Sequence, residues 1–276
     1  MQNRTLIIAG MHRSGTSLIT HWLNECGLHL GESFLGPGLG NTEGHYEDIE
    51  FLKLHEEILS DNKLPSTGLT EAHNIELSLY HKEKLKSVIK VKNKLYQQWG
   101  WKDPRTCLFL DTYKELIPDA RYLIIIRDYK AVVSSLLRRD FQGFEKKYMS
   151  RSYLKRLYWI KYQRKGRLRE LYTQWAEHYL KVWIAYNEEI LKNVQNLPKH
   201  AYVMLNYSML KSNDESVCSY LNKRWNLSLK YFKFREVFKE KLISEQVDTD
   251  SYIFNKSLTS QADQLQKSLD NYMMLM

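Results

Sequence analysis

Residues 5–17 read T-L-I-I-A-G-M-H-R-S-G-T-S, and this stretch decides the fold. The short continuous apolar run from Thr5 to Ala9 is typical of a buried parallel strand. Gly10 to Gly15 interrupt that run. Apolar residues then recur with helical spacing from Thr16 to Cys26, and Gly27 is well placed to end a helix. The sequence therefore predicts a strand, a tight loop and a helix in direct succession.

The loop between this strand and helix predicts an anion site. Backbone N–H groups of such a loop point at one place, and the dipole of the following helix favours negative charge there. Gly10 and Gly15 permit backbone conformations that other residues resist. Further donors are offered by His12, Arg13, Ser14, Thr16 and Ser17. The alternative interpretation is a tight turn that binds no ligand.

The glycine spacing also fits the nucleotide-hydrolase loop G-x-x-x-x-G-K-[ST]. The lysine of that motif reaches the outer phosphates of a nucleoside triphosphate, but here Thr16 occupies its position. This difference counts against an ATPase or a kinase. A cation is still available earlier in the loop, at Arg13.

Strands and helices alternate along the rest of the chain. Strands are predicted over 99–101, 121–126 and 201–205, and helices over 47–59, 75–95, 106–117, 129–139, 152–194, 216–223 and from 258 to the end. This order predicts an α/β fold with a central parallel sheet. We expect a single domain over residues 1–276, with a basic helical insertion around 143–196.

Composition excludes several classes of protein. The 276 residues are 43% hydrophobic and 26% charged, which is an ordinary globular balance. Cys26, Cys107 and Cys218 are odd in number and widely spaced, which argues against a disulfide framework or a zinc site.

No apolar run approaches the roughly 20 residues of a membrane span. Because the first predicted strand begins at Thr5, we expect no signal peptide and a soluble cytoplasmic protein.

A second anion site is predicted after the strand over residues 121–126. Arg127 lies at the carboxyl end of that strand, where open α/β sheets bind ligands. Ser135 follows about two helical turns later. An arginine and a serine hydroxyl can hold a phosphate together. Alternatively, Arg127 forms a surface ion pair with Asp128, and Ser135 is a small packing residue.

The two motifs together resemble those of sulfotransferases that use 3′-phosphoadenosine 5′-phosphosulfate. Further fragments are similar to the bacterial, glycan-type branch of that family: N-T-E-G-H-Y-E-D over 41–48, W-K-D-P-R over 101–105 and S-L-L-R-R-D over 135–140. The resemblance extends from about Leu6 to Leu221. It implies a three-layer α/β/α sulfotransferase fold, similar to that of the P-loop hydrolases, and catalysis without a metal.

The resemblance also implies roles for individual residues. The loop over 10–17 would bind the 5′-phosphosulfate, Arg127 and Ser135 the 3′-phosphate, and Tyr207 would lie near the adenine. Arg13 replaces the lysine of the cytosolic branch, and Ser208 stands where that branch has an acidic residue. Arg164-Lys165-Gly166 matches a family motif in letters but not in position, so its role is not transferred.

Sulfuryl transfer requires a base for the acceptor and donors for the leaving oxygen. Arg13, the loop amides and Lys102 are candidates for stabilising the leaving oxygen. Glu47 is the first candidate for the base, because glutamate is common in the glycan branch, and His45 is the second. Glu43 and Asp48 lie in the same stretch, where acidic residues also favour a helix start. Arg105 would bind the sulfonate or acceptor, or pair with a carboxylate.

The segment from Lys146 to Arg169 holds ten Lys or Arg and no Asp or Glu, interleaved with aromatic residues. One hypothesis is a platform for an anionic acceptor, such as an acidic glycan or a lipid head group. The alternative is a solvated helical face. No nucleic-acid-binding motif is present, so nucleic acid is not the expected partner.

Taken together, these features predict a sulfotransferase that acts on a hydroxyl or amine of a glycan, glycolipid or small metabolite. The alternatives are a P-loop kinase or other nucleoside-triphosphate enzyme, and a non-catalytic anion-binding module of the same fold.

Overall fold

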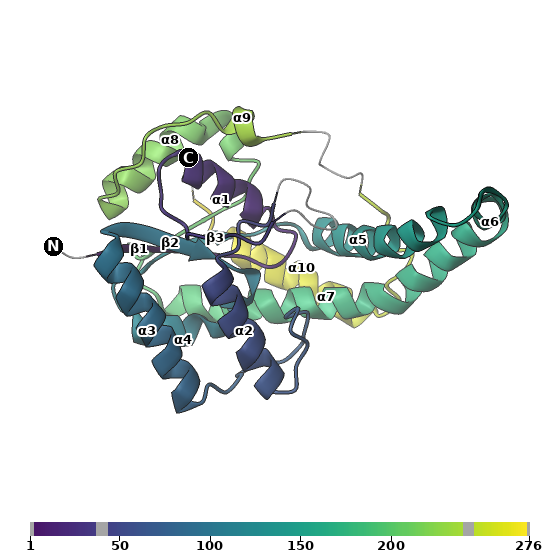
Figure 1. Ribbon diagram of the computed structural model, residues 1–276, viewed down its shortest axis with the longest axis horizontal. Helices are drawn as coiled ribbons and strands as arrows, with labels where there is room; N and C mark the ends of the chain where they lie inside the picture. Colours follow the sequence, from purple (N-terminus) through teal and green to yellow (C-terminus); the bar gives the residue numbers. More distant parts are fainter. Residues whose placement is uncertain (1–2, 37–43, 240–245, 275–276) are drawn as a thin grey trace.

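The computed structural model describes residues 3–36, 44–239 and 246–274 (Figure 1). Its strands are β1 (Arg4–Ala9), β2 (Gln98–Lys102), β3 (Arg121–Ile125) and β4 (Tyr202–Leu205). Its helices are α1 (Thr16–Glu25), α2 (Ile49–Asp61), α3 (Leu79–Leu95), α4 (Leu110–Leu116), α5 (Tyr129–Met149), α6 (Tyr153–Tyr158), α7 (Arg164–Asn196), α8 (Leu210–Trp225), α9 (Phe234–Val237) and α10 (Lys256–Asp270). A 3-10 segment, η1 (Pro104–Phe109), and a π segment, η2 (Trp159–Gln163), connect neighbouring helices or strands.

The strands form a parallel sheet in the order β2-β1-β3-β4. Within it, Ile7 of β1 lies opposite Trp101 of β2 on one side and Tyr122 of β3 on the other. Because the strands are parallel, the segments that follow them meet at one edge of the sheet. The loop after β1, residues 103–105 after β2 and Arg127 after β3 therefore share that edge. This arrangement confirms the predicted parallel sheet.

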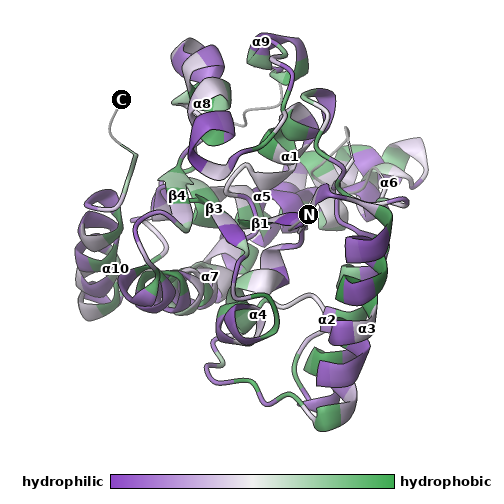
Figure 2. Ribbon diagram, turned by 90° about the vertical axis from the view of Figure 1, so that its left-hand side faces the viewer, coloured by the Kyte–Doolittle hydropathy of each residue, from purple (hydrophilic) through white to green (hydrophobic). Residues whose placement is uncertain are grey.

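Side chains of β1 alternate between two hydrophobic clusters, as a strand buried on both faces requires. Leu6 and Ile8 pack with α1, α8 and α9 on one face of the sheet. Ile7 and Ala9 pack on the opposite face with helices α2, α3, α4, α5, α7 and α10. Figure 2 shows the sheet between these two groups of helices. The predicted three-layer α/β/α architecture is confirmed.

Several element boundaries differ from the prediction. The helix predicted over 106–117 is η1 followed by α4, and η1 begins at Pro104, where the Asp103 carboxylate accepts the N–H of Arg105 at 2.8 Å. Helix α3 begins at Leu79 rather than near Ile75, because the Ser78 hydroxyl caps it by accepting the N–H of His81. Helix α8 is longer than predicted, and α9 was not predicted.

Helices α5 and α7 pack against each other and project as an arm, with α6 and η2 at its far end (Figure 1). The region predicted as an insertion, residues 143–196, runs from within α5 to the end of α7. The second half of α7, from Tyr172 to Val194, buries its apolar face in the core cluster that contains Ile7. Helix α7 lies below the sheet in Figure 2. Among the described helices, none is both long and apolar enough to cross a membrane.

Candidate functional site

The loop from Gly10 to Gly15 joins β1 to α1 at the carboxyl edge of the sheet. A side chain is excluded at Gly10, because its Cβ atom would lie 2.4 Å from the carbonyl oxygen of Ile125. Arg13 and Gly15 have φ angles of 67° and 93°, so the backbone is left-handed at both positions just before α1. No described side chain caps the start of α1. The first N–H groups of this helix therefore remain available to a ligand.

Arg13 links this loop to the second predicted anion site. Its Nε atom donates a hydrogen bond to Ser135 Oγ at 2.9 Å, and its carbonyl oxygen accepts one from Arg127 at 2.8 Å. Ser135 is buried on α5, whereas Asp128 caps the same helix by accepting the N–H of Ala131. Arg127 forms no ion pair with Asp128 or any other described carboxylate. The structure thus brings Arg13, Arg127 and Ser135 together.

A local excess of positive charge surrounds these residues. Burial first, and then the nearby charges of Arg139 and Arg127, lower the pKa of Arg13 to about 10. Arg139 is paired with Asp140 at 2.7 Å, but neither Arg13 nor Arg127 has a carboxylate partner among the described residues. Partly buried cations that lack a counter-charge favour the binding of an anion.

Tyr207 extends the site toward β4. A Cβ atom on Gly15 would lie 3.0 Å from the ring of Tyr207, and the guanidinium of Arg127 lies 5.7 Å from the centre of that ring. Arg127 and Tyr207 also line a cavity of about 410 Å³, together with Ser134 and Asn206. A cavity of this size and mixed polarity suits a nucleoside.

Lys102 and Glu47 form a buried ion pair beside the loop. The Nζ atom of Lys102 lies 3.0 Å from Glu47 Oε1 and 3.2 Å from Ser17 Oγ. Burial lowers the pKa of Lys102, and the attraction of Glu47 opposes this shift. The ion pair thus joins the end of β2, the start of α1 and the segment before α2 at one point.

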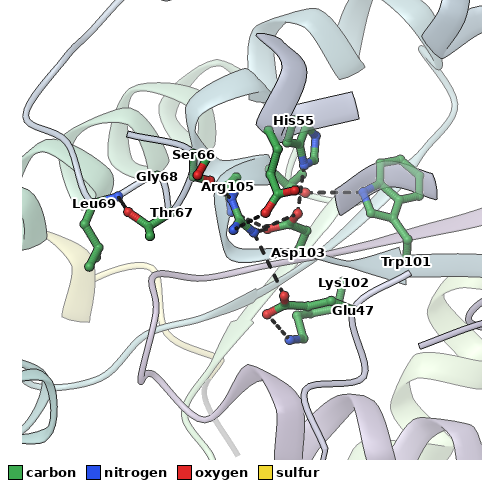
Figure 3. Close-up of polar contacts among 12 residues, drawn as sticks. Glu47, His55, Ser66, Thr67, Gly68, Leu69, Trp101, Lys102, Asp103 and Arg105 are labelled. Carbon is green, nitrogen blue, oxygen red and sulfur yellow. Dashed lines mark hydrogen bonds and ion pairs between the residues drawn. The ribbon is translucent and has the colours of Figure 1, made fainter. Parts of the chain in front are cut away.

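Arg105 and Asp103 extend this network toward His55 (Figure 3). Arg105 lies 3.9 Å from Glu47 and 3.0 Å from Asp103, and its Nε donates to the carbonyl of Ser66 at 2.7 Å. Asp103 also contacts Nδ1 of His55 at 3.0 Å. Arg105 was expected either to bind the sulfonate or acceptor or to pair with a carboxylate. It pairs with carboxylates, and its contact with Glu47 helps to hold that side chain in place.

The two candidate histidines lie near this charge cluster. Burial lowers the pKa of His45, and the Lys102 and Arg13 charges act in the same direction while Glu47 opposes them. Burial and then the charge of Arg105 lower the pKa of His12 to about 3, and His12 Nε2 has no hydrogen-bond partner among the described residues. His12 is therefore a neutral imidazole at neutral pH.

Asp48 is turned away from the loop and has a structural role. Its carboxylate accepts the N–H of Glu50 at 2.9 Å and so caps α2. Glu32, Asp48 and Glu50 bring carboxylate oxygens within 4.8 Å of one another, but the ammonium of Lys92 pairs with all three. A lysine thus supplies the cation of this cluster. Glu43 lies outside the described residues.

Arg139 was not predicted as a site residue. Arg139 follows Ser135 by four positions on α5, so both side chains lie on one face of that helix. That spacing was a usable signal within the S-L-L-R-R-D motif. The His55–Asp103 contact had no sequence signal, because 48 residues separate the two partners.

The chain is similar to known proteins in sequence and in fold. The model of a family described as "Sulfotransferase family" matches residues 5–230. Among solved structures, the chain is similar to the sulfotransferase STF9 from Mycobacterium avium, with 14% identity, 100% of this chain and 78% of that chain covered, and a TM-score of 0.59. The sulfotransferase domain of the Synechococcus PCC 7002 olefin synthase gives 14% identity, coverage of 98% and 96%, and a TM-score of 0.47. No match was found among curated protein sequences.

Proposed function

This chain belongs to the sulfotransferase family. We propose that it moves a sulfuryl group from 3′-phosphoadenosine 5′-phosphosulfate to a hydroxyl or amine of an acceptor. The acceptor that we propose is a glycan, a glycolipid or a small metabolite. One observation supports this choice of donor above all. Arg13 touches both Ser135 and, through its carbonyl, Arg127, so two anion-binding elements lie side by side.

A donor with phosphate at both the 5′ and the 3′ position would use both elements. The backbone N–H groups before and at the start of α1, with Arg13, bind the 5′-phosphosulfate. Arg127 and Ser135 bind the 3′-phosphate. The adenine and ribose occupy the cavity lined by Arg127 and Tyr207. A nucleoside triphosphate fits this arrangement less well, because buried Thr16 replaces the lysine that would reach its outer phosphates.

The transfer step uses the ion pair of Lys102 and Glu47. The acceptor oxygen or nitrogen attacks the sulfur and forms a new S–O or S–N bond, while the bond from sulfur to the bridging oxygen of the donor breaks. The proton of the acceptor passes to the Glu47 carboxylate. Negative charge grows on the 5′-phosphate of the departing 3′,5′-bisphosphate, where Lys102, Arg13 and the loop N–H groups stabilise it.

Glu47 is preferred to His45 as the base for a geometric reason. The Glu47 carboxylate lies 3.0 Å from Lys102, and Lys102 contacts Ser17 of the loop. These contacts support a position for Glu47 beside the sulfuryl group of the proposed donor. The imidazole of His45 makes no side-chain hydrogen bond to a described residue that would orient it. His45 stays the second candidate, with its neutral form favoured by its lowered pKa.

Two measurements test this function. Calorimetry with 3′-phosphoadenosine 5′-phosphate and with ATP should show clear preference for the bisphosphate. Transfer from radiolabelled donor to a panel of glycans, glycolipids and small hydroxyl compounds should then identify the acceptor class. A preference for ATP would contradict the proposed identity of the donor. Donor binding without transfer to any acceptor would indicate a non-catalytic anion-binding module.

A further inference from the structure

The far end of the arm exposes a concentrated group of apolar side chains. We define the arm tip as residues 149–162, which cover the end of α5, all of α6 and most of η2. Its exposed apolar and tyrosine side chains are Met149, Tyr153, Leu154, Leu157, Tyr158, Ile160 and Tyr162. Leu154 is 77% exposed. Clustered exposure of this kind marks an interaction surface, whereas single exposed apolar residues do not.

Positive charge at and beside the arm tip is mostly not neutralised by acidic residues. Ten Lys or Arg and no acidic residue lie between Lys146 and Arg169. Within the described residues, only two of these ten form ion pairs, Arg164 with Glu145 and Arg167 with Glu170. The remaining eight cations leave the tip strongly electropositive, which predicts an anionic partner.

Four of the exposed side chains of the tip lie on one side of α6. Tyr153, Leu154, Leu157 and Tyr158 occupy positions i, i+1, i+4 and i+5 of α6, which share one helix face. Trp159 faces the opposite way and is 1% exposed, stacked on Tyr148 of α5 with 4.1 Å between ring centres. The tip is thus a packed turn that presents its leucines and tyrosines outward.

We propose that the arm tip docks the protein on an anionic lipid surface. The apolar face of α6 would enter the interface between head groups and acyl chains, while the surrounding lysines and arginines contact anionic head groups. Tyrosines are well suited to this boundary because one end of the ring is apolar and the other is polar. The tip projects away from the body in Figure 1, so it can meet a flat surface before the body does.

Other occupants fit these observations less well. Nucleic acid would use the cations and tyrosines, but it offers no apolar phase for Leu154, Leu157 and Ile160. A second copy of the tip would bring together two surfaces with the same excess of positive charge. A lipid surface supplies both negative charge and hydrocarbon. Docking by the arm tip does not depend on the proposed sulfuryl transfer.

Co-sedimentation of the full chain with lipid vesicles tests the proposal. We expect binding to phosphatidylcholine vesicles that contain ~30% phosphatidylserine, and loss of most of this binding as salt rises toward ~0.5 M. The double variant Leu154→Glu/Leu157→Glu should lower the partition coefficient at least ~10-fold. Lys155→Gln/Lys161→Gln should also weaken binding and reduce its salt dependence.

Leu79→Glu is the matched control, because Leu79 is 75% exposed on α3, outside the arm. It should bind vesicles like the unmodified protein. Circular dichroism tests whether each variant is folded. Equal vesicle binding by the Leu154→Glu/Leu157→Glu variant and the unmodified protein would overturn the proposal, as would equally tight binding to pure phosphatidylcholine vesicles. A dimer seen by sedimentation velocity and abolished by this double variant would overturn the proposal in favour of a second copy of the tip. Oligonucleotide binding tighter than vesicle binding would overturn it in favour of nucleic acid.

Discussion

Arg13 Nε donates a hydrogen bond to Ser135 Oγ at 2.9 Å, although 122 positions separate the two residues in the chain. One side chain thereby joins the loop after β1 to the helix after β3. Arg127 reinforces the same junction by donating to the Arg13 carbonyl at 2.8 Å. An anion bound at the loop after β1 would therefore affect the position of the helix after β3, and an anion bound at the helix would affect the loop.

Arg127→Ala should weaken the binding of the 3′-phosphate much more than the binding of the 5′-phosphate group. We expect at least ~10-fold weaker binding of 3′-phosphoadenosine 5′-phosphate, because a charge-assisted hydrogen bond contributes about 1.5–3 kcal/mol. Adenosine 5′-phosphosulfate, which has no 3′-phosphate, should lose much less affinity. Calorimetry measures both. Lys130→Ala is the control, since Lys130 lies in the first turn of α5, three residues after Arg127, but pairs with Asp250 at the surface.

An equal loss of affinity for the two nucleotides would contradict this assignment. It would mean that Arg127 acts by holding the Arg13 carbonyl and thus the whole loop, rather than by binding the 3′-phosphate.

Glu47→Gln should lower the turnover number at least ~100-fold, the usual effect of losing a general base. The affinity for the bisphosphate, measured by calorimetry, should change little, because Gln keeps the shape of the side chain. Glu56→Gln is a matched control: Glu56 lies 3.4 Å from the same Arg105 but makes no contact with Lys102. If Glu47→Gln keeps near-normal turnover, the base is not Glu47, and His45→Gln becomes the next variant to measure.

His12 should make the protein less stable as the medium becomes more acidic. Its pKa falls from 6.5 to about 3 on folding, so between these values the unfolded chain binds a proton that the folded protein does not. Stability due to this group is therefore complete above about pH 6.5 and is lost as the pH falls toward 3, at up to ~1.4 kcal/mol per pH unit.

Urea unfolding at a series of pH values between about 7 and 4 measures this effect. His12→Gln should flatten the dependence of the unfolding free energy on pH, whereas His200→Gln, at an exposed histidine, should not. The same slope in all three proteins would show that His12 is not the responsible group.

Gly10→Ala and Gly166→Ala should have opposite effects on stability. A methyl group on Gly10 would collide with the Ile125 carbonyl, and relief of such overpacking costs about 1–3 kcal/mol. Gly166 lies in α7 with no atom within 4 Å of an added Cβ, so alanine there should stabilise by ~0.5–1 kcal/mol. Thermal unfolding monitored by circular dichroism compares the two. A Gly10→Ala protein as stable as the unmodified one would mean that β1 and β3 can shift apart at little cost.

The sequence predicted the parallel sheet and the order of its elements because the signals are local. The apolar run 5–9 and the helical spacing after Thr16 depend only on neighbouring residues. The helix over 106–117 was less well predicted, because Pro104 and the Asp103 cap favour a 3-10 segment at its start. The bounds of α3 were set by the cap at Ser78 rather than by apolar spacing.

The sequence by itself determined the chemistry of the loop that begins at Gly10: its glycines, its arginine, and the threonine in place of a lysine. Only the tertiary structure decided which charges meet there. It paired Lys102 with Glu47, turned Asp48 toward Lys92, and brought Arg13 to Ser135. The physical reason is that backbone conformation depends on near neighbours in the chain, whereas electrostatic pairing depends on distance in space, which is set when the parallel strands bring their carboxyl ends to one edge.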